Sequence, residues 1–162
     1  MTTFFSDSEH PEEPKAPPKS ARRRSREFIL QGLYQRRVGG ADEASIEAYA
    51  PEMEGFAKAD REFFVGTLRG VIGQHEKLTE QISAHIDRPF GELSPVEACI
   101  LMMGSFEMIN HPETPYRVII NEAIELTKAF GGTDGHKYVN GVLDKVAAVV
   151  RADEVAARKK GK

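Results

Sequence analysis

The clearest alternation of apolar and polar residues runs from Pro115 to Val150 and predicts two helices joined by a turn at Gly131 and Gly132. Thr114 is expected to cap the first helix, with Pro115 at its first position, where the missing N–H is not needed. The second helix has the stronger apolar stripe, which consists of Val139, Val142, Leu143, Val146, Val149 and Val150. This face is therefore expected to be buried against the rest of the chain.

Polar residues of several kinds follow the turn. The two glycines are expected to adopt the left-handed conformation that ends a helix, and Thr133 or Asp134 is expected to cap the next one. A cation, an aromatic ring and an amide then stand near a helix N-terminus, together with a histidine, at His136, Lys137, Tyr138 and Asn140. Backbone N–H groups point outward there, so this set suits a phosphate and a stacked base. A solvated helix start with a half-buried Tyr138 is the competing interpretation.

The N-terminal part of the pattern predicts two shorter elements. Ser20 is expected to cap a first helix that ends at Gly39 and Gly40, and its apolar positions are Phe28, Ile29, Leu33 and Tyr34. Asp42 is expected to cap a short second helix that ends at Pro51. We assign this second helix no role beyond packing.

The longest predicted helix starts after Asp60 and carries one continuous apolar seam, made by Phe64, Leu68, Val71, His75, Leu78 and Ile82. His75 on this seam is interpreted as a core histidine and not as a metal ligand. Gly66, Gly70 and Gly73 weaken the helix, so they are expected to allow the close approach of a neighbouring helix or a ligand.

A capping box predicts the next helix start. Ser94 and Glu97 have the spacing of such a box, and Pro95 occupies the first helical position. The preceding Arg88–Pro89 step is expected to break the longest helix. The new helix is expected to run to Asn110.

Composition narrows the class of protein. A chain of 162 residues is long enough for one domain with its own core. Its net charge of −3 gives no global sign of nucleic-acid binding, so any such activity must depend on local clusters of charge. No apolar run approaches the ~18 residues that cross a membrane, and the N-terminus does not read as a signal peptide. We therefore expect a cytoplasmic protein.

Motifs of catalysis and metal binding are missing from the sequence. The single cysteine, Cys99, excludes an internal disulfide and a thiolate zinc site. There is no nucleophile elbow, no phosphate loop of the GxxxxGK[ST] type, and no histidine paired with an evident nucleophile. We therefore expect no enzyme, no metal and no cofactor.

A cluster of four arginines precedes the first apolar stripe, at Arg22, Arg23, Arg24 and Arg26. Cations at a helix start oppose the helix dipole, so this placement costs stability. The cluster is either a solvated charge run or an arm that binds phosphates, since arginine-rich segments often fold onto RNA. The residues alone leave both interpretations open.

Three stretches together resemble the NusB family of bacterial transcription antitermination factors. The run INEAIELTKAFGGTDGHKYVNGVLDKV resembles its C-terminal signature, and ARRRSREFILQGLYQ looks like the arginine-rich motif with which these proteins begin. The stretch LSPVEACILMMGSFEMI is similar to the middle of the family. The resemblance covers about residues 21–151. It implies an all-α fold in which two three-helix halves, divided near residue 90, form one compact helical domain.

The same resemblance implies a function and its partners. It implies binding of single-stranded boxA-type RNA in the leader of ribosomal RNA transcripts, together with the ribosomal protein NusE. The pair joins an RNA polymerase antitermination complex. Members of the family occur as monomers and as homodimers, and both states remain open for this chain.

The resemblance also implies which residues act. Phosphates would be held by Arg22, Arg23, Arg24 and Arg26. The stacking faces would be Tyr34 and Tyr138, and the other side of the RNA track would be lined by Thr133, Asp134, His136 and Lys137. Glu97 matches a glutamate at the surface used by the partner protein. Met102 and Phe106 stand where the family commonly has arginine and tyrosine, which puts local polar contacts in doubt.

A second function remains as an alternative, namely a helical protein-interaction module without sequence-specific RNA binding. Its arginines would serve solubility or an acidic partner. Salt dependence separates the two, because phosphate contacts weaken steeply with salt and a hydrophobic interface does not.

The two ends of the chain differ from its middle. Residues 1–20 are rich in proline and acidic side chains and are expected to be a disordered tail. Residues 21–151 are expected to form the helical domain. Residues 152–162 are expected to be a basic tail after the last helix.

Overall fold

The computed structural model describes residues 20–161, and within this range the chain forms eight α-helices, three 3₁₀ helices and no strand. The α-helices are α1 (Ala21–Gly39), α2 (Glu43–Tyr49), α3 (Arg61–Gly73), α4 (His75–Ser83), α5 (Pro95–Asn110), α6 (Tyr116–Phe130), α7 (Gly135–Val150) and α8 (Ala152–Lys160). The 3₁₀ helices are η1 (Ala50–Glu52), η2 (Phe56–Lys58) and η3 (Phe90–Glu92). The predicted all-α class is confirmed. The predicted disordered tail lies outside the described residues, except for Ser20.

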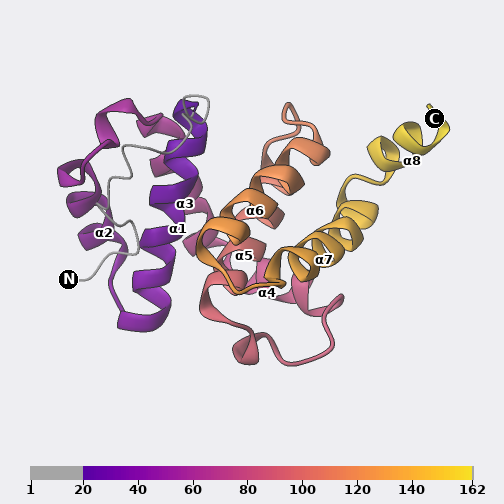
Figure 1. Ribbon diagram of the computed structural model, residues 1–162, viewed down its shortest axis with the longest axis horizontal. Coiled ribbons are helices and arrows are strands. Elements are labelled where there is room, and N and C mark those ends of the chain that lie inside the picture. The colour runs from indigo at the N-terminus through magenta and orange to yellow at the C-terminus, as the bar shows by residue number, and fades with distance from the viewer. Residues whose placement is uncertain (1–19, 162) are drawn as a thin grey trace.

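Helix α5 lies at the centre of the molecule and packs against α1, α3, α4, α6 and α7. Every residue from Ala98 to Met108 is buried, because α5 is apolar on all sides and not along one stripe. The helices α1, α2 and α3 lie on one side of it, and α6 and α7 lie on the other (Figure 1).

The predicted helix starts are confirmed at four caps. The side chains of Ser20, Asp42, Asp60 and Ser94 accept hydrogen bonds from backbone N–H groups three residues later, at 3.1, 2.8, 3.0 and 3.5 Å. Helix α1 ends as predicted, with Gly40 in the left-handed conformation at φ 73°. Short-range capping chemistry therefore fixes most element boundaries.

The prediction of one long helix after Asp60 is wrong, because the chain breaks between α3 and α4 at Gln74. The amide of Gln74 lies 3.4 and 3.5 Å from that of Asn110 in two hydrogen bonds, which tie the junction to the end of α5. His75 follows the break and is exposed, so it does not belong to the apolar seam. The interpretation of His75 as a core histidine is therefore also wrong.

The break changes where the two halves of the fold meet. Helix α4 precedes residue 90, yet it packs on α5 and α7 of the second half. The first half therefore consists of α1, α2 and α3, and the boundary lies near residue 74 and not near residue 90.

The turn between α6 and α7 differs from the prediction in its conformation. Gly131 is extended, at φ −97° and ψ −172°, and Asp134 precedes α7 without a side-chain capping bond. Helix α6 begins at Tyr116, whose N–H donates to Glu154 at 2.8 Å, so Thr114 is not its cap.

The basic segment after α7 is also helical, which was not predicted. Helix α8 projects from the end of α7 (Figure 1) and has no fully buried residue. Arg151 and Glu154 attach it to the body of the fold through α5 and α6.

One of the three glycines of α3 makes the predicted close approach. A Cβ atom at Gly70 would lie 2.2 Å from the ring of Phe106 in α5, whereas one at Gly66 would meet nothing within 4 Å. The absence of a side chain at Gly70 thus sets how closely α3 and α5 approach each other.

Replacing Gly70 with alanine is expected to lower the free energy of unfolding by about 1–3 kcal/mol, because the buried Phe106 ring must move. The matched variant Gly66→Ala is expected to raise it by about 0.5–1 kcal/mol through helix propensity alone. Urea unfolding followed by circular dichroism measures both. Equal effects at the two positions would contradict the close packing of α3 on α5.

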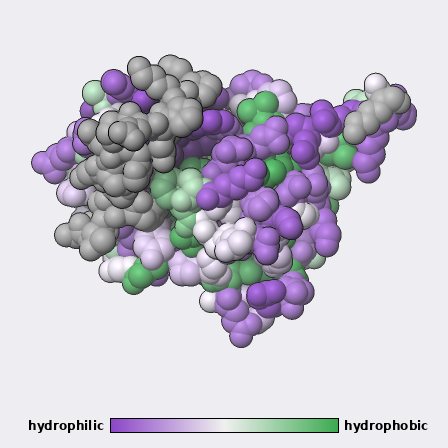
Figure 2. Space-filling view, in the orientation of Figure 1, coloured by the Kyte–Doolittle hydropathy of each residue, from purple (hydrophilic) through white to green (hydrophobic). Residues whose placement is uncertain are grey.

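The face formed by α6 and α7 would offer a partner mainly polar contacts. Hydrophilic residues dominate the face formed by α6 and α7, and hydrophobic residues appear there only in scattered groups (Figure 2). No helix within residues 20–161 is long and apolar enough to cross a membrane.

Candidate nucleic-acid interface

The arginines at the start of α1 divide into buried and exposed members. Arg26 is 5% exposed, and its guanidinium donates to both carboxylate oxygens of Glu107, at 2.7 and 2.9 Å. Burial alone would lower the pKa of Arg26, but the bonds and the charge of Glu107 more than offset this and raise it. Arg26 is buried between α1 and α5, so it is not accessible to a phosphate as the sequence had suggested.

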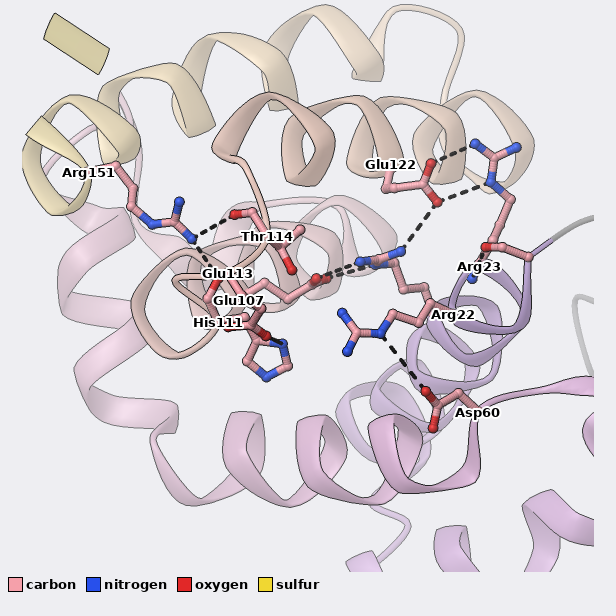
Figure 3. A network of polar contacts seen from close by, with 11 residues as sticks. Arg22, Arg23, Asp60, Glu107, His111, Glu113, Thr114, Glu122 and Arg151 are labelled. Atoms are coloured by element: carbon pink, nitrogen blue, oxygen red, sulfur yellow. Dashed lines mark hydrogen bonds and ion pairs between the residues drawn. The ribbon is translucent and has the colours of Figure 1, made fainter. Parts of the chain in front are cut away.

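Arg23 is held in an ion pair but remains partly exposed. It donates to the two oxygens of Glu122 in α6, at 3.1 and 2.6 Å, and these hydrogen bonds raise its pKa. Glu122 also lies 3.5 Å from Arg26, so one carboxylate joins the exposed and the buried arginine (Figure 3). A phosphate would have to compete with Glu122 for Arg23.

Arg22 and Arg24 are the more accessible members of the cluster. Arg22 lies over the ring of Phe63 at 4.7 Å and is 3.9 Å from Asp60, with 43% of its side chain exposed. Arg24 is partly exposed beside Gly55, and within residues 20–161 it has no carboxylate at ion-pair distance. Two cations are therefore available at this end of α1 without breaking a bidentate pair.

The start of α7 forms a second polar cluster. Lys137 and Asp134 form an exposed ion pair at 3.6 Å, Thr133 is exposed, and His136 is partly exposed. Tyr138 is half-buried, and its pKa is raised by burial and by the charge of Asp87.

Arg88 was missed as a candidate residue by the sequence analysis. It reaches this cluster from the segment before η3, and its guanidinium lies 5.5 Å from the Tyr138 ring centroid. Asp87 holds it at 2.9 Å, and 49% of the Arg88 side chain is exposed. No signal in the sequence connects residue 88 with residue 138, because only the fold brings these segments together.

Glu97 lies against the start of α7. A Cβ atom at Gly135 would lie 3.1 Å from a carboxylate oxygen of Glu97, so glycine leaves room for this side chain. A carboxylate at a helix N-terminus is favoured by the exposed N–H groups and the dipole. Glu97 is only partly exposed and thus has a structural role beside its predicted partner contact.

The arginine cluster and the polar cluster at the start of α7 lie near different ends of α1. Arg37, near the end of α1, covers the Phe90 ring at 4.9 Å, and Phe90 follows closely after the Arg88 that covers Tyr138. Tyr34, partly exposed and one turn before Arg37, therefore lies towards the Tyr138 end of the molecule. Arg23 and Tyr34 are separated by roughly 16 Å along the helix axis. The predicted residues thus form two groups and not one pocket.

The structure offers no metal-binding cluster in the part of the chain that it describes. Within residues 20–161, no three or more His, Cys, Asp or Glu side chains are grouped so as to hold a metal ion. The candidate residues provide exposed cations, two half-buried phenol rings and paired carboxylates, and the cations suit reversible binding of an anion.

Known proteins resemble this chain in sequence and in fold. The NusB family model matches residues 23–148. The chain is 87% identical over 162 residues to the transcription antitermination protein NusB of Dechloromonas aromatica, covering 100% of this chain and 99% of that protein. It is 54% identical to the protein of the same name from Ralstonia nicotianae, over 92% of this chain and 96% of that protein.

A solved structure of T. maritima NusB superposes with a TM-score of 0.72 at 26% identity, covering 82% of this chain and 94% of that one. The relatives are named for transcription antitermination and not for a catalysed reaction. The family model spans α1 to most of α7, and the similarity to the two relatives extends over nearly their whole length. The chain therefore belongs to the NusB family.

Proposed function

We propose that this chain is a transcription antitermination factor that binds single-stranded boxA-type RNA of ribosomal RNA leaders together with the ribosomal protein NusE. It would act in the cytoplasm as part of an RNA polymerase antitermination complex. The observation that carries the proposal is the 87% identity, over the whole chain, to a transcription antitermination protein. The exposed cations at the start of α1 support its RNA-binding part.

Phosphates of the RNA would first meet Arg22 and Arg24, because neither must leave a bidentate ion pair. Arg23 would contribute by exchanging its bonds to Glu122 for bonds to a phosphate. Charge-assisted bonds of this kind position an RNA strand but do not read its sequence.

Sequence preference would come from the cluster at α7. Unstacked bases would contact the exposed parts of Tyr34 and Tyr138, and Lys137 and Arg88 would neutralise the phosphates beside them. Thr133, Asp134 and His136 would line this part of the RNA track. NusE would contact the surface around Glu97, next to the same cluster.

The double variant Arg22→Ala/Arg24→Ala is expected to bind a short boxA-like RNA roughly ten- to hundredfold more weakly than the unaltered chain, since charge-assisted bonds are lost. The slope of log affinity against log salt should fall by about 1.4, at ~0.7 for each phosphate on a single strand. Fluorescence anisotropy across a salt series, with boxA-like and scrambled RNA and with or without NusE, measures both quantities.

Arg69→Ala is the matched control, because Arg69 is an exposed arginine that pairs with Glu47 on a different surface. This control should leave affinity and slope unchanged. If the chain binds boxA-like and scrambled RNA equally, or binds neither even with NusE, the RNA-binding proposal fails. A protein-interaction role without sequence-specific RNA binding would then replace it.

A further inference from the structure

A cavity of about 840 Å³ lies where the two halves of the fold meet. Its walls come from the C-terminal part of α1, the junction of α3 and α4, and the first half of α5. The junction at Gln74 lines the cavity, and the side chain of Gln74 pairs with that of Asn110. Neither the arginine cluster at Arg22–Arg26 nor the start of α7 contributes to it.

The floor of this cavity is aliphatic. Its main residues are Leu33, Val71, Ala98, Cys99 and Met102. Burial raises the pKa of Cys99 to about 12, so this thiol is neutral and behaves as a small apolar group. No Phe, Tyr or Trp is among the lining residues and His75 belongs to the rim, so the floor suits an aliphatic side chain better than a stacked base.

The rim of the cavity is basic. Arg36, Arg37, His75 and Lys77 line it, and Glu76 is the one carboxylate among the lining residues. Arg37 is held over Phe90, and Arg36 donates to the carbonyl of Ala41 at 3.4 Å. The rim is thus positive on a chain whose net charge is −3.

These cations differ from most other arginines of the fold. Arg23, Arg26, Arg69, Arg88, Arg117 and Arg151 each have a carboxylate oxygen within 3.0 Å. Within residues 20–161, Arg36, Arg37 and Lys77 have no carboxylate within 4.0 Å. The rim therefore presents cations that the described part of the chain does not hold in ion pairs, although hydrogen bonds from Ser45 and the charge of Arg36 lower the pKa of the nearby Asp42.

We infer that this cavity is a docking site for an acidic peptide segment of a protein partner, which places an aliphatic side chain on the floor and carboxylates on the rim. Charge complementarity selects the carboxylates, and the aliphatic and thioether floor accepts leucine or isoleucine. The site shares no lining residue with the proposed RNA-binding clusters, although Tyr34 lies beside it on α1. It does not depend on the RNA-binding proposal.

The test is a titration of the ¹⁵N-labelled full chain with a synthetic helical peptide that carries leucines on one face and glutamates on the other. Backbone amide signals of residues 71–77 and 98–102 are expected to shift. One matched peptide has lysine in place of each glutamate, and another has serine in place of each leucine. Neither is expected to produce these shifts.

The double variant Arg36→Glu/Lys77→Glu reverses two exposed rim charges. It is expected to weaken binding of the glutamate peptide about tenfold, since two attractions become repulsions. Lys128→Glu/Lys145→Glu makes the same change of net charge at two exposed positions outside the cavity and should have little effect. Unaltered affinity of the rim variant for boxA-like RNA would separate this site from the RNA-binding clusters.

Three results would overturn the inference. The first is no shift with the glutamate peptide, or shifts confined to other helices. The second is equal binding of the lysine peptide, which would remove the charge argument. The third is a shift of residues 71–77 by boxA-like RNA, which would make the cavity part of an RNA-binding surface.

Discussion

Replacing Arg26 with methionine is expected to lower the free energy of unfolding by about 3–5 kcal/mol. Methionine fills much of the same space, but it leaves the carboxylate of Glu107, which is 2% exposed, without its cation. An uncompensated buried charge is costly because no water can reach it. Urea unfolding followed by circular dichroism measures the loss.

The double variant Arg26→Met/Glu107→Met tests the cause. It removes both charges, so most of the lost stability is expected to return. Arg69→Met, which breaks the exposed pair with Glu47, is the matched single variant and should cost less than about 1 kcal/mol. An Arg26→Met chain as stable as the Arg69→Met chain would contradict the buried ion pair.

Arg151→Met is expected to be about as damaging, with a loss of about 3–5 kcal/mol in the free energy of unfolding. Arg151 is 9% exposed, and its guanidinium donates to the carbonyls of Met108, His111 and Thr114, at 2.7, 2.8 and 3.1 Å (Figure 3). It also forms an ion pair with Glu154. The substitution removes the Arg151 donor from all three carbonyls, of which that of His111 still accepts from the Thr114 N–H at 3.0 Å.

Two further variants define what Arg151 contributes. Arg151→Lys keeps the charge but cannot donate along several directions at once, so an intermediate loss is expected. Arg158→Met, in the exposed last turn of α8, should change stability by no more than about 0.5 kcal/mol. Thermal unfolding of the three variants side by side distinguishes the bonds of Arg151 from its charge. A wild-type melting temperature for Arg151→Met would refute this role.

Most of the fold follows from local rules that the sequence displays. Caps at Ser20, Asp42, Asp60 and Ser94 and the end of α1 at Gly39 and Gly40 were predicted, because each depends on residues within one helical turn. The break at Gln74 was not predicted, since the apolar positions of α3 and α4 continue with one helical spacing across it. At the break, the side chain of Gln74 pairs with that of Asn110, a residue 36 positions later.

The candidate interface was harder to predict for the same reason. Four arginines near the start of α1 look alike in the sequence, yet Arg26 is buried and pairs with a carboxylate 81 residues away. Periodicity gives the face of a helix, but it does not say which charge on that face meets an opposite charge. Arg88 was missed because its neighbour Tyr138 belongs to a distant helix.

The bonds of Arg151 and Glu154 also constrain the order in which the chain can fold as it is made. The N–H of Tyr116 at the start of α6 is capped by Glu154, which follows 38 residues later. At ~5–20 residues per second, α6 emerges roughly 2–8 s before the side chain that caps it. During that interval the carbonyls of Met108, His111 and Thr114 also lack the guanidinium of Arg151. The second half of the fold therefore closes only after α7 has been synthesised.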